Sequence, residues 1–192
     1  MSKAVLISIR PQWCEKIVNG EKTIEVRKTR PKLQTPFKCY IYCTMDHPYI
    51  SVSCAELDKL NYRTNTVGRC NGKVIGEFVC DCVTPLYNVC MDDWKRLAGG
   101  LHNIEKELVN QACLTEAKLH TYAGGKNCFA WHISDLRIYD TPRDLGEFKT
   151  LCRVDADCCA CPYYNYTKMG CDGRVIGRPP QSWCYVDDLQ TK

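Results

Sequence analysis

The sequence has no long apolar run, no internal repeat and no low-complexity segment. Its 192 residues include no stretch near the roughly 18 apolar residues that a transmembrane helix needs. The N-terminal apolar stretch AVLISI ends at Arg10 and is too short for the core of a secretion signal. Because 45% of the residues are hydrophobic and 25% are charged, a globular core is expected. We therefore expect a soluble, cytoplasmic protein with no membrane partner.

Cysteine, in contrast, is abundant, with 16 residues. In a secreted protein this density would predict a disulfide scaffold. Without a secretion signal, the sequence favours reduced thiols that are buried as small apolar side chains or bound to a metal. Strand-like runs contain Cys39, Cys43, Cys80 and Cys82, and we expect these four in the core.

The segment 152–171, CRVDADCCACPYYNYTKMGC, gathers cysteines in a different pattern. Cys158 and Cys161 have the C-x-x-C spacing of half a zinc site, because a tight turn lets both thiolates bind one ion. Cys152 and Cys171 are the candidates to complete it, with Cys184 as a further option. Zinc would supply folding free energy to a segment poor in apolar residues. Free thiols, or a Cys158–Cys161 disulfide in an oxidising compartment, are the alternatives.

Positive charge is concentrated near the N-terminus. Residues 1–38 contain nine Lys or Arg and three Glu, whereas the other 154 residues contain 17 basic and 19 acidic side chains. The first fifth of the chain thus carries a charge of +6 and the rest carries −2, which together give the net charge of +4. This asymmetry favours an anionic partner such as nucleic acid, the alternative being a solvated basic surface.

Hydrophobic patterning predicts an α+β protein. Alternation of apolar residues predicts strands at 4–10, 22–28, 37–45, 73–83, 127–140 and 178–186. A short helix is expected between Pro11 and Gly20, helices are expected at 91–120, and a bulge is expected near Ser134 and Asp135. The alternating Trp131 is expected in the core. This order predicts a small, mostly antiparallel β-barrel with flanking helices. Residues 1–150 would form it, with the helical insertion at about 91–120, and a cysteine-rich tail at 151–192 would add the final strand to the same domain.

The stretch GEKTIEVRK (20–28) is the most informative local pattern. Glu25 and Arg27 point to one face of the predicted second strand. Ser8 and Arg10 leave the polar side of the first strand, just before a helix N-terminus that favours an anion. If the first two strands pair, these side chains converge, with Lys22 at the rim. The alternative is an exposed ion pair with no ligand.

The run SIRPQWCEKIVNGEKTIEVRK resembles the opening of ASCH domains, which belong to the PUA-like superfamily. Their G-x-K-x-x-E-x-R pattern is matched by Gly20, Lys22, Glu25 and Arg27. Three later pieces, GKVIGEFVCD, YAGGKNCFAWHISDLRIYD and PPQSWCYV, resemble ASCH proteins of gut bacteria and their phages in the same order. The resemblance implies a PUA-like barrel of five or six strands, closed at one end by a helix. ASCH and PUA-like domains are associated with RNA, modified nucleosides or RNA-directed enzymes.

The sequence therefore predicts a protein that binds RNA, or a nucleotide or modified nucleoside, in a basic cleft beside the first helix. The residues expected in the cleft are Ser8, Arg10, Trp13, Lys22, Glu25 and Arg27, and the further candidates for ligand contact are Lys126, Gln181, Ser182 and Trp183.

Two alternatives stay open. The first is a hydrolase, an amidohydrolase or ribonuclease, with Lys22 and Glu25 as catalytic residues. One branch of the family hydrolyses acetylcytidine with a Lys, a Thr and a Glu. The resemblance carries this Lys to Lys22, but the catalytic Thr falls on Glu25, where the sequence departs from that branch. The second alternative is a zinc-stabilised interaction module.

Overall fold

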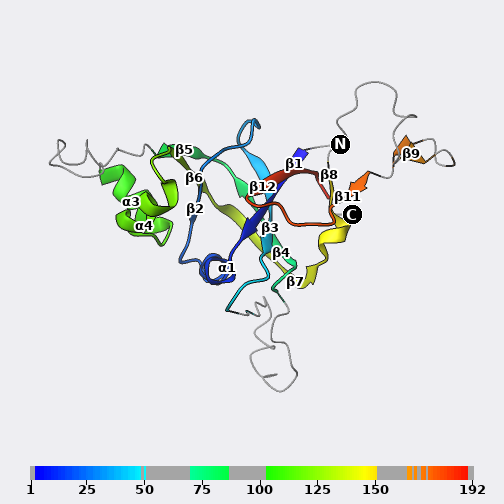
Figure 1. Cartoon of the computed structure of the whole chain (residues 1–192), viewed down its shortest axis with the longest axis horizontal. Helices are drawn as coiled ribbons and strands as arrows, with labels where there is room; N and C mark the ends of the chain where they lie inside the picture. The colour runs from blue at the N-terminus through cyan, green and yellow to red at the C-terminus, as the bar shows by residue number, and fades with distance from the viewer. Residues whose placement is uncertain are drawn as a thin grey trace, which may run out of the picture.

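The computed structural model describes residues 3–48, 50, 70–86, 103–150, 164, 165, 167, 170, 171 and 173–189. Its main element is a seven-stranded sheet with the order β11-β8-β12-β1-β3-β4-β7 (Figure 1). These strands are β1 (Lys3–Ile9), β3 (Phe37–Cys43), β4 (Val74–Cys80), β7 (Ser134–Arg143), β8 (Lys149–Thr150), β11 (Arg174–Val175) and β12 (Trp183–Asp187).

A three-stranded sheet lies beside the large one, in the order β2-β6-β5. It consists of β2 (Ile24–Arg27), β5 (Val83–Leu86) and β6 (Cys128–His132). The remaining elements are a two-stranded ribbon of β9 (Tyr164–Asn165) and β10 (Gly170–Cys171), the helices α1 (Pro11–Val18), α3 (Asn103–Gln111) and α4 (Glu116–Ala123), and the short 3₁₀ turn η2 (Leu145–Glu147).

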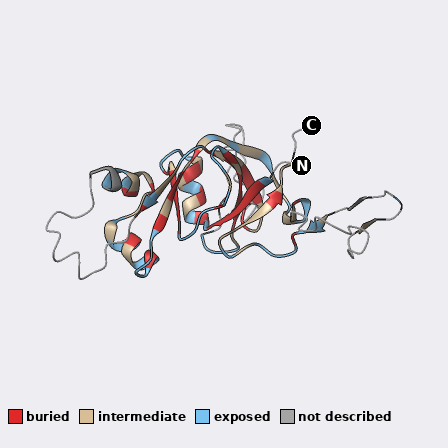
Figure 2. Cartoon of the chain, turned by 90° about the horizontal axis from the view of Figure 1, so that it is seen from above, coloured by how far each residue is buried: buried red, intermediate tan, exposed pale blue. Residues whose placement is uncertain are grey.

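The central strand β1 is buried on both faces. It pairs with β3 in parallel and with β12 antiparallel, so that Ile7 lies between Ile41 and Trp183. Val5 and Ile7 point into one apolar cluster, whereas Leu6 points into another on the opposite face. Burial is therefore greatest along the middle of the large sheet (Figure 2).

The α+β class that the sequence predicts is confirmed, but the described strands do not close into a barrel. The large sheet is open, with β11 and β7 at its edges. The expected pairing of the first two strands is also wrong, because β1 lies in the large sheet and β2 in the small one. Between them, α1 buries Cys14 and Ile17 in the core of the large sheet and leads the chain to its neighbour.

The chain passes between the sheets at three further points. These are the connections from β2 to β3 and from β4 to β5, and Ile133, between β6 and β7. Asp135 has a positive φ of 45°, and the β4–β7 register shifts between Glu77 and Val79. The β4–β7 pairing is therefore irregular where the sequence predicts a bulge, near Ser134 and Asp135, and the chain changes sheet just before it.

The helices α3 and α4 cover one face of the small sheet. Ile24 and Val26 of β2 pack there in an apolar cluster with Val109, Leu119 and Ala130. In Figure 1 this helical end lies away from β8 and β11. Residues 87–102, which include the start of the predicted helical insertion, lie outside the described residues. None of the helices in the described ranges is long and apolar enough to cross a membrane.

Candidate ligand-binding site

Three charged side chains are buried at the junction of the two sheets. Lys22, Glu25 and Arg27 are 3%, 7% and 8% exposed. The Glu25 carboxylate bridges the two cations, with Oε1 at 3.0 Å from Nη2 of Arg27 and Oε2 at 3.4 Å from Nζ of Lys22. We call these three residues the buried charged cluster. An exposed ion pair, the alternative considered for this strand, is therefore excluded.

Alternation along β2 places two members of the cluster on the same face. Ile24 and Val26 pack toward the helices, so Glu25 and Arg27 point to the opposite face of the small sheet. Arg27 Nη2 donates a hydrogen bond of 2.6 Å to the main-chain oxygen of Ser8 in β1. The guanidinium therefore connects the two sheets.

Lys22 reaches the cluster from the turn that precedes β2. Gly20, at a φ of +75°, follows α1, and the Lys22 amide bonds to the carbonyl of Lys16. Lys22 Nζ donates to the Ala112 oxygen at 2.8 Å, just beyond the end of α3, where the helix dipole favours a cation. Nζ also lies 5.3 Å from the centroid of the Trp13 ring. The sequence places Lys22 at a rim, whereas the structure buries it.

Two buried N–H donors on this face have no hydrogen-bond partner in the described structure. They are Nε of Arg27 and Nε1 of Trp131. Trp131 is the direct cross-strand partner of Glu25, so its side chain shares the face of Glu25 and Arg27. Trp131 is fully buried, as its alternation predicts. An unsatisfied buried donor costs about 1–3 kcal/mol, which an acceptor from a ligand would offset.

The cluster has an excess of positive charge. Within the described part of the chain, Glu25 is the only carboxylate within ion-pair distance of Lys22 or Arg27. The neighbouring Cys14 adds no negative charge, because burial, the thiol of Cys43 and the Glu25 carboxylate all raise its pKa. Two buried cations therefore share one anion, an arrangement that favours a negatively charged ligand.

Tyr122 of α4 is a neighbour of the cluster that the sequence does not predict. Burial raises the pKa of Tyr122, and the Arg27 guanidinium acts on it in the opposite direction. The residue is nevertheless 39% exposed. Tyr122 therefore connects the buried cluster with the protein surface. The segment YAGGK gives no signal for this, because the contact depends on how α4 packs against β2.

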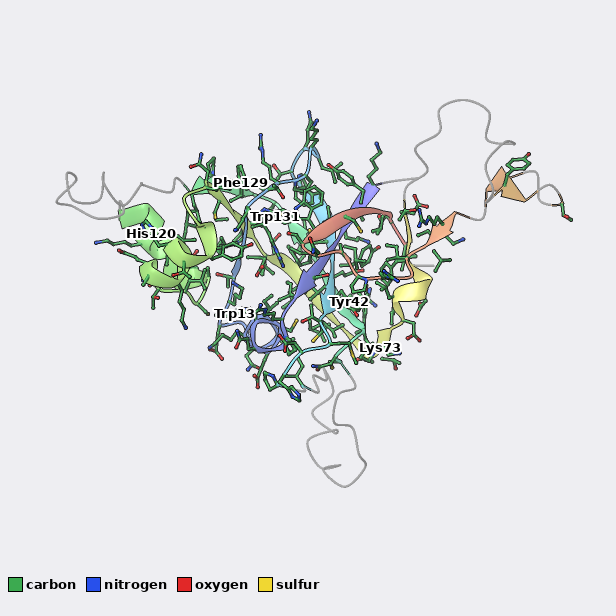
Figure 3. The ribbon with its side chains drawn as sticks, viewed as in Figure 1. Trp13, Tyr42, Lys73, His120, Phe129 and Trp131 are labelled. Carbon is green, nitrogen blue, oxygen red and sulfur yellow. The ribbon has the colours of Figure 1, made fainter. Side chains whose placement is uncertain are left out.

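The structure brings only some of the other predicted residues to the cluster. Ser8 contributes its main-chain oxygen, while its hydroxyl donates to the oxygen of Pro180 at 2.6 Å. Trp13, which Figure 3 labels on α1, has its ring beside Lys22 Nζ. Arg10 does not join them, because its side chain is 71% exposed and lies 4.0 Å from Asp46.

The candidates near the C-terminus and the 124–126 turn lie outside the cluster. Lys126 and Gln181 are exposed. Ser182 acts through its backbone, which accepts a hydrogen bond from the amide of Ser8. Trp183 packs in an aromatic group, with its ring centroid 6.0 Å from that of Trp131, and donates to Thr29 Oγ1 at 3.0 Å.

The zinc prediction falls mostly on residues that the structure does not describe. Cys152, Cys158 and Cys161 lie outside the described residues, and Cys171 is described only as part of the β10 backbone. Elsewhere, no group of three or more His, Cys, Asp or Glu side chains within the described ranges is arranged to hold a metal. The nine cysteines described with their side chains form no disulfide with one another.

Comparison with known proteins identifies the fold. No family model and no curated protein matches the sequence. The crystal structure of ASCH from Zymomonas mobilis, in contrast, matches 96% of this chain and 88% of its own, with a TM-score of 0.51 and 18% identity. The chain has an ASCH fold. Two mutants of the same Zymomonas mobilis protein match it with TM-scores of 0.52 and 0.51, at 18% identity, over 97% and 96% of this chain and 92% and 89% of theirs.

The ASCH fold confirms the resemblance that the G-x-K-x-x-E-x-R pattern indicates. In this fold the pattern runs from the turn after α1 through β2. Its Lys, Glu and Arg are the three members of the buried charged cluster.

Proposed function

We propose that this protein binds RNA, or a nucleotide or modified nucleoside, at the buried charged cluster. The observation that carries the proposal is the excess of buried positive charge, with one carboxylate between two cations. Burial of unpaired charge is costly, and a bound anion would offset that cost. The ASCH fold supports the choice of ligand, because ASCH and PUA-like domains are associated with RNA and modified nucleosides.

The donors and acceptors of the cluster fit a nucleotide. A guanidinium forms strong, charge-assisted bonds to phosphate or carbonyl oxygens, and the Nε of Arg27 is a buried donor with no described partner. The indole N–H of Trp131 is a second such donor on the same face. The Glu25 carboxylate can accept from a ribose hydroxyl or a base amine. Phosphate, sugar and base therefore each have a chemically matched group.

Binding to a fluorescein-labelled single-stranded RNA, measured by anisotropy over a series of salt concentrations, tests this proposal. We expect affinity to fall as salt rises, and Arg27→Ala to weaken binding about 10- to 100-fold, because it removes charge-assisted hydrogen bonds. Arg10→Ala is the matched control, since it removes the same charge from an exposed side chain outside the cluster.

Arg27 also connects the two sheets, so folding must be checked independently. Arg27→Lys keeps the charge but loses the planar fork, and Trp131→Phe removes one donor while keeping most of the ring. Both variants should bind the RNA more weakly than the wild type while their circular dichroism spectra stay like that of the wild type. Equal affinity of the wild type, Arg27→Lys and Arg10→Ala for the RNA would contradict the proposal.

A hydrolase is the second candidate, because Lys22 Nζ and Glu25 Oε2 are 3.4 Å apart in a buried site. A buried amine beside a carboxylate can serve as a base or a nucleophile. Acetylated cytidine and single-stranded RNA are the substrates to assay, by chromatography of the products. Turnover by the wild type that is lost in Lys22→Met and kept in Arg10→Ala would favour catalysis, whereas binding without turnover favours the first proposal.

A further inference from the structure

Exposed cations and aromatic rings line the surface next to Arg27. Lys28 and Arg30 directly follow β2, and both are exposed. Lys28 Nζ lies 5.2 Å from the ring centroid of Tyr122, and the Arg30 guanidinium lies 6.0 Å from that of Phe129. We call these four residues the surface strip. Its cations come from the segment after β2, and its rings come from α4 and β6.

One side-chain and one backbone hydrogen bond join this segment to the large sheet. Trp183 Nε1 donates to Thr29 Oγ1 at 3.0 Å, and the Lys32 amide donates to the Tyr185 hydroxyl at 2.7 Å. Both aromatic residues belong to β12. The residues bonded to β12, Thr29 and Lys32, lie next to the exposed side chains of Lys28 and Arg30 in the sequence. The cations are therefore displayed by a supported backbone, which lowers the entropy cost of ordering them on a ligand.

The surface strip is continuous with the buried charged cluster. Phe129 is the cross-strand partner of Arg27, so the two side chains share one face of the small sheet. Tyr122 is partly exposed, and its ring lies beneath Lys28 Nζ. The Arg27 guanidinium acts to lower the pKa of the Tyr122 hydroxyl, against the effect of burial. Figure 3 shows Phe129 and Trp131 on the same strand, β6. A ligand bound at Arg27 would therefore meet aromatic rings and cations where it leaves the cluster.

We propose that the ligand is a single-stranded RNA that places one nucleotide at the buried charged cluster and its neighbouring nucleotides on the surface strip. This inference rests on the proposed function and specifies its substrate class. Bases stack on aromatic rings such as those of Tyr122 and Phe129, and Lys28 and Arg30 bind the phosphates. A free nucleotide would leave the strip unused, and a duplex would keep its bases paired and away from the buried Arg27.

Two probes separate this inference from the proposed function. One is uridine monophosphate, and the other is a labelled oligouridylate of about ten nucleotides, within the range that one small binding domain covers. We expect the oligonucleotide to bind more tightly. Tyr122→Ala should weaken its binding about 5- to 100-fold, the equivalent of one lost stacking contact, whereas Tyr122→Phe should retain it. A plot of log binding constant against log salt concentration has a negative slope, and Lys28→Ala and Arg30→Ala should each make that slope less steep by about 0.7.

The control for charge is Arg137→Ala, an exposed residue of β7 at the edge of the large sheet, which should change neither affinity nor slope. Oligonucleotide binding that is no tighter than that of the monophosphate would overturn the surface strip, as would full affinity in Tyr122→Ala. If either result is found but Arg27→Ala still weakens the binding of uridine monophosphate, the proposed function stands and only the surface strip is wrong. If the wild type binds neither probe, the proposed function itself fails.

Discussion

Glu25→Gln is the most direct test of the electrostatics that hold the two sheets together. Glu25 is the only described carboxylate that pairs with Lys22 and Arg27, and it is buried. The substitution keeps the shape of the side chain and removes one negative charge. It therefore leaves two cations in a buried site with no compensating anion.

The expected cost is a large fraction of the stability of the domain. Removal of one partner from a buried pair costs about 3–5 kcal/mol, while a typical domain is stable by about 5–15 kcal/mol. With a urea m-value of about 2 kcal/mol/M, the unfolding midpoint should fall by about 2 M. The assay is urea unfolding followed by circular dichroism, with m-values compared to confirm that the native state stays compact.

Glu21→Gln is the matched control for this experiment. Glu21 Oε2 lies 2.7 Å from Lys16 Nζ, a shorter distance than either contact of Glu25, but both side chains are exposed. Solvent screening and side-chain entropy leave such surface pairs with little net effect. The control should therefore unfold like the wild type, because burial and not distance sets the energy of these pairs.

A double mutant makes the reasoning refutable. Lys22→Met with Glu25→Gln removes one cation and the anion, so the buried charge returns to one positive unit. The double mutant should be more stable than the sum of the two single changes predicts, by about 0.5–3 kcal/mol. Strict additivity, or a Glu25→Gln change below 1 kcal/mol, would show that water already screens the cluster.

Three further predictions concern other parts of the chain. Gly76→Ala should destabilise the protein by about 1–3 kcal/mol in urea unfolding, because a Cβ there would lie 2.5 Å from a β7 carbonyl oxygen. A hydrogen bond from His132 lowers the pKa of Asp81, so the stability that this contributes is fully present above the ordinary carboxyl pKa and is lost as pH falls through the lowered value. The Tm deficit of Asp81→Asn should therefore begin to shrink below about pH 4 and vanish only below the lowered pKa. If the cysteine-rich tail binds zinc, elemental analysis should find zinc in the purified protein and none in Cys158→Ser or Cys161→Ser, and a metal-free wild type would refute it.

The sequence predicts the local part of the site because that part depends on strand alternation. The period of two along β2 correctly separates Ile24 and Val26 from Glu25 and Arg27. It does not show that both faces of β2 are covered. The sequence therefore leaves an exposed ion pair as an alternative, and it places Lys22 at a rim.

The tertiary part of the site has no local signal. Lys22 is held by the carbonyl of Ala112, 90 residues away, and Tyr122 reaches Arg27 from a helix whose position depends on packing. The pairing of the first two strands is wrong for a similar reason, because β1 pairs in parallel with β3 across a sequence separation that alternation does not encode. Arg10, which leaves β1 on the expected side, consequently ends at the surface.

A buried excess of charge is costly to keep without a ligand, and this links stability to binding. If an anionic ligand compensates that charge in the folded state only, it must stabilise the fold by RT ln(1 + [L]/Kd), or about 2.7 kcal/mol at 100 times Kd. The stabilisation should be larger in Glu25→Gln than in the wild type if the ligand takes the position of a missing anion, and smaller if Glu25 itself contacts the ligand. Thermal shifts of both proteins with the same oligonucleotide therefore reveal whether Glu25 only balances charge or also recognises the base or sugar.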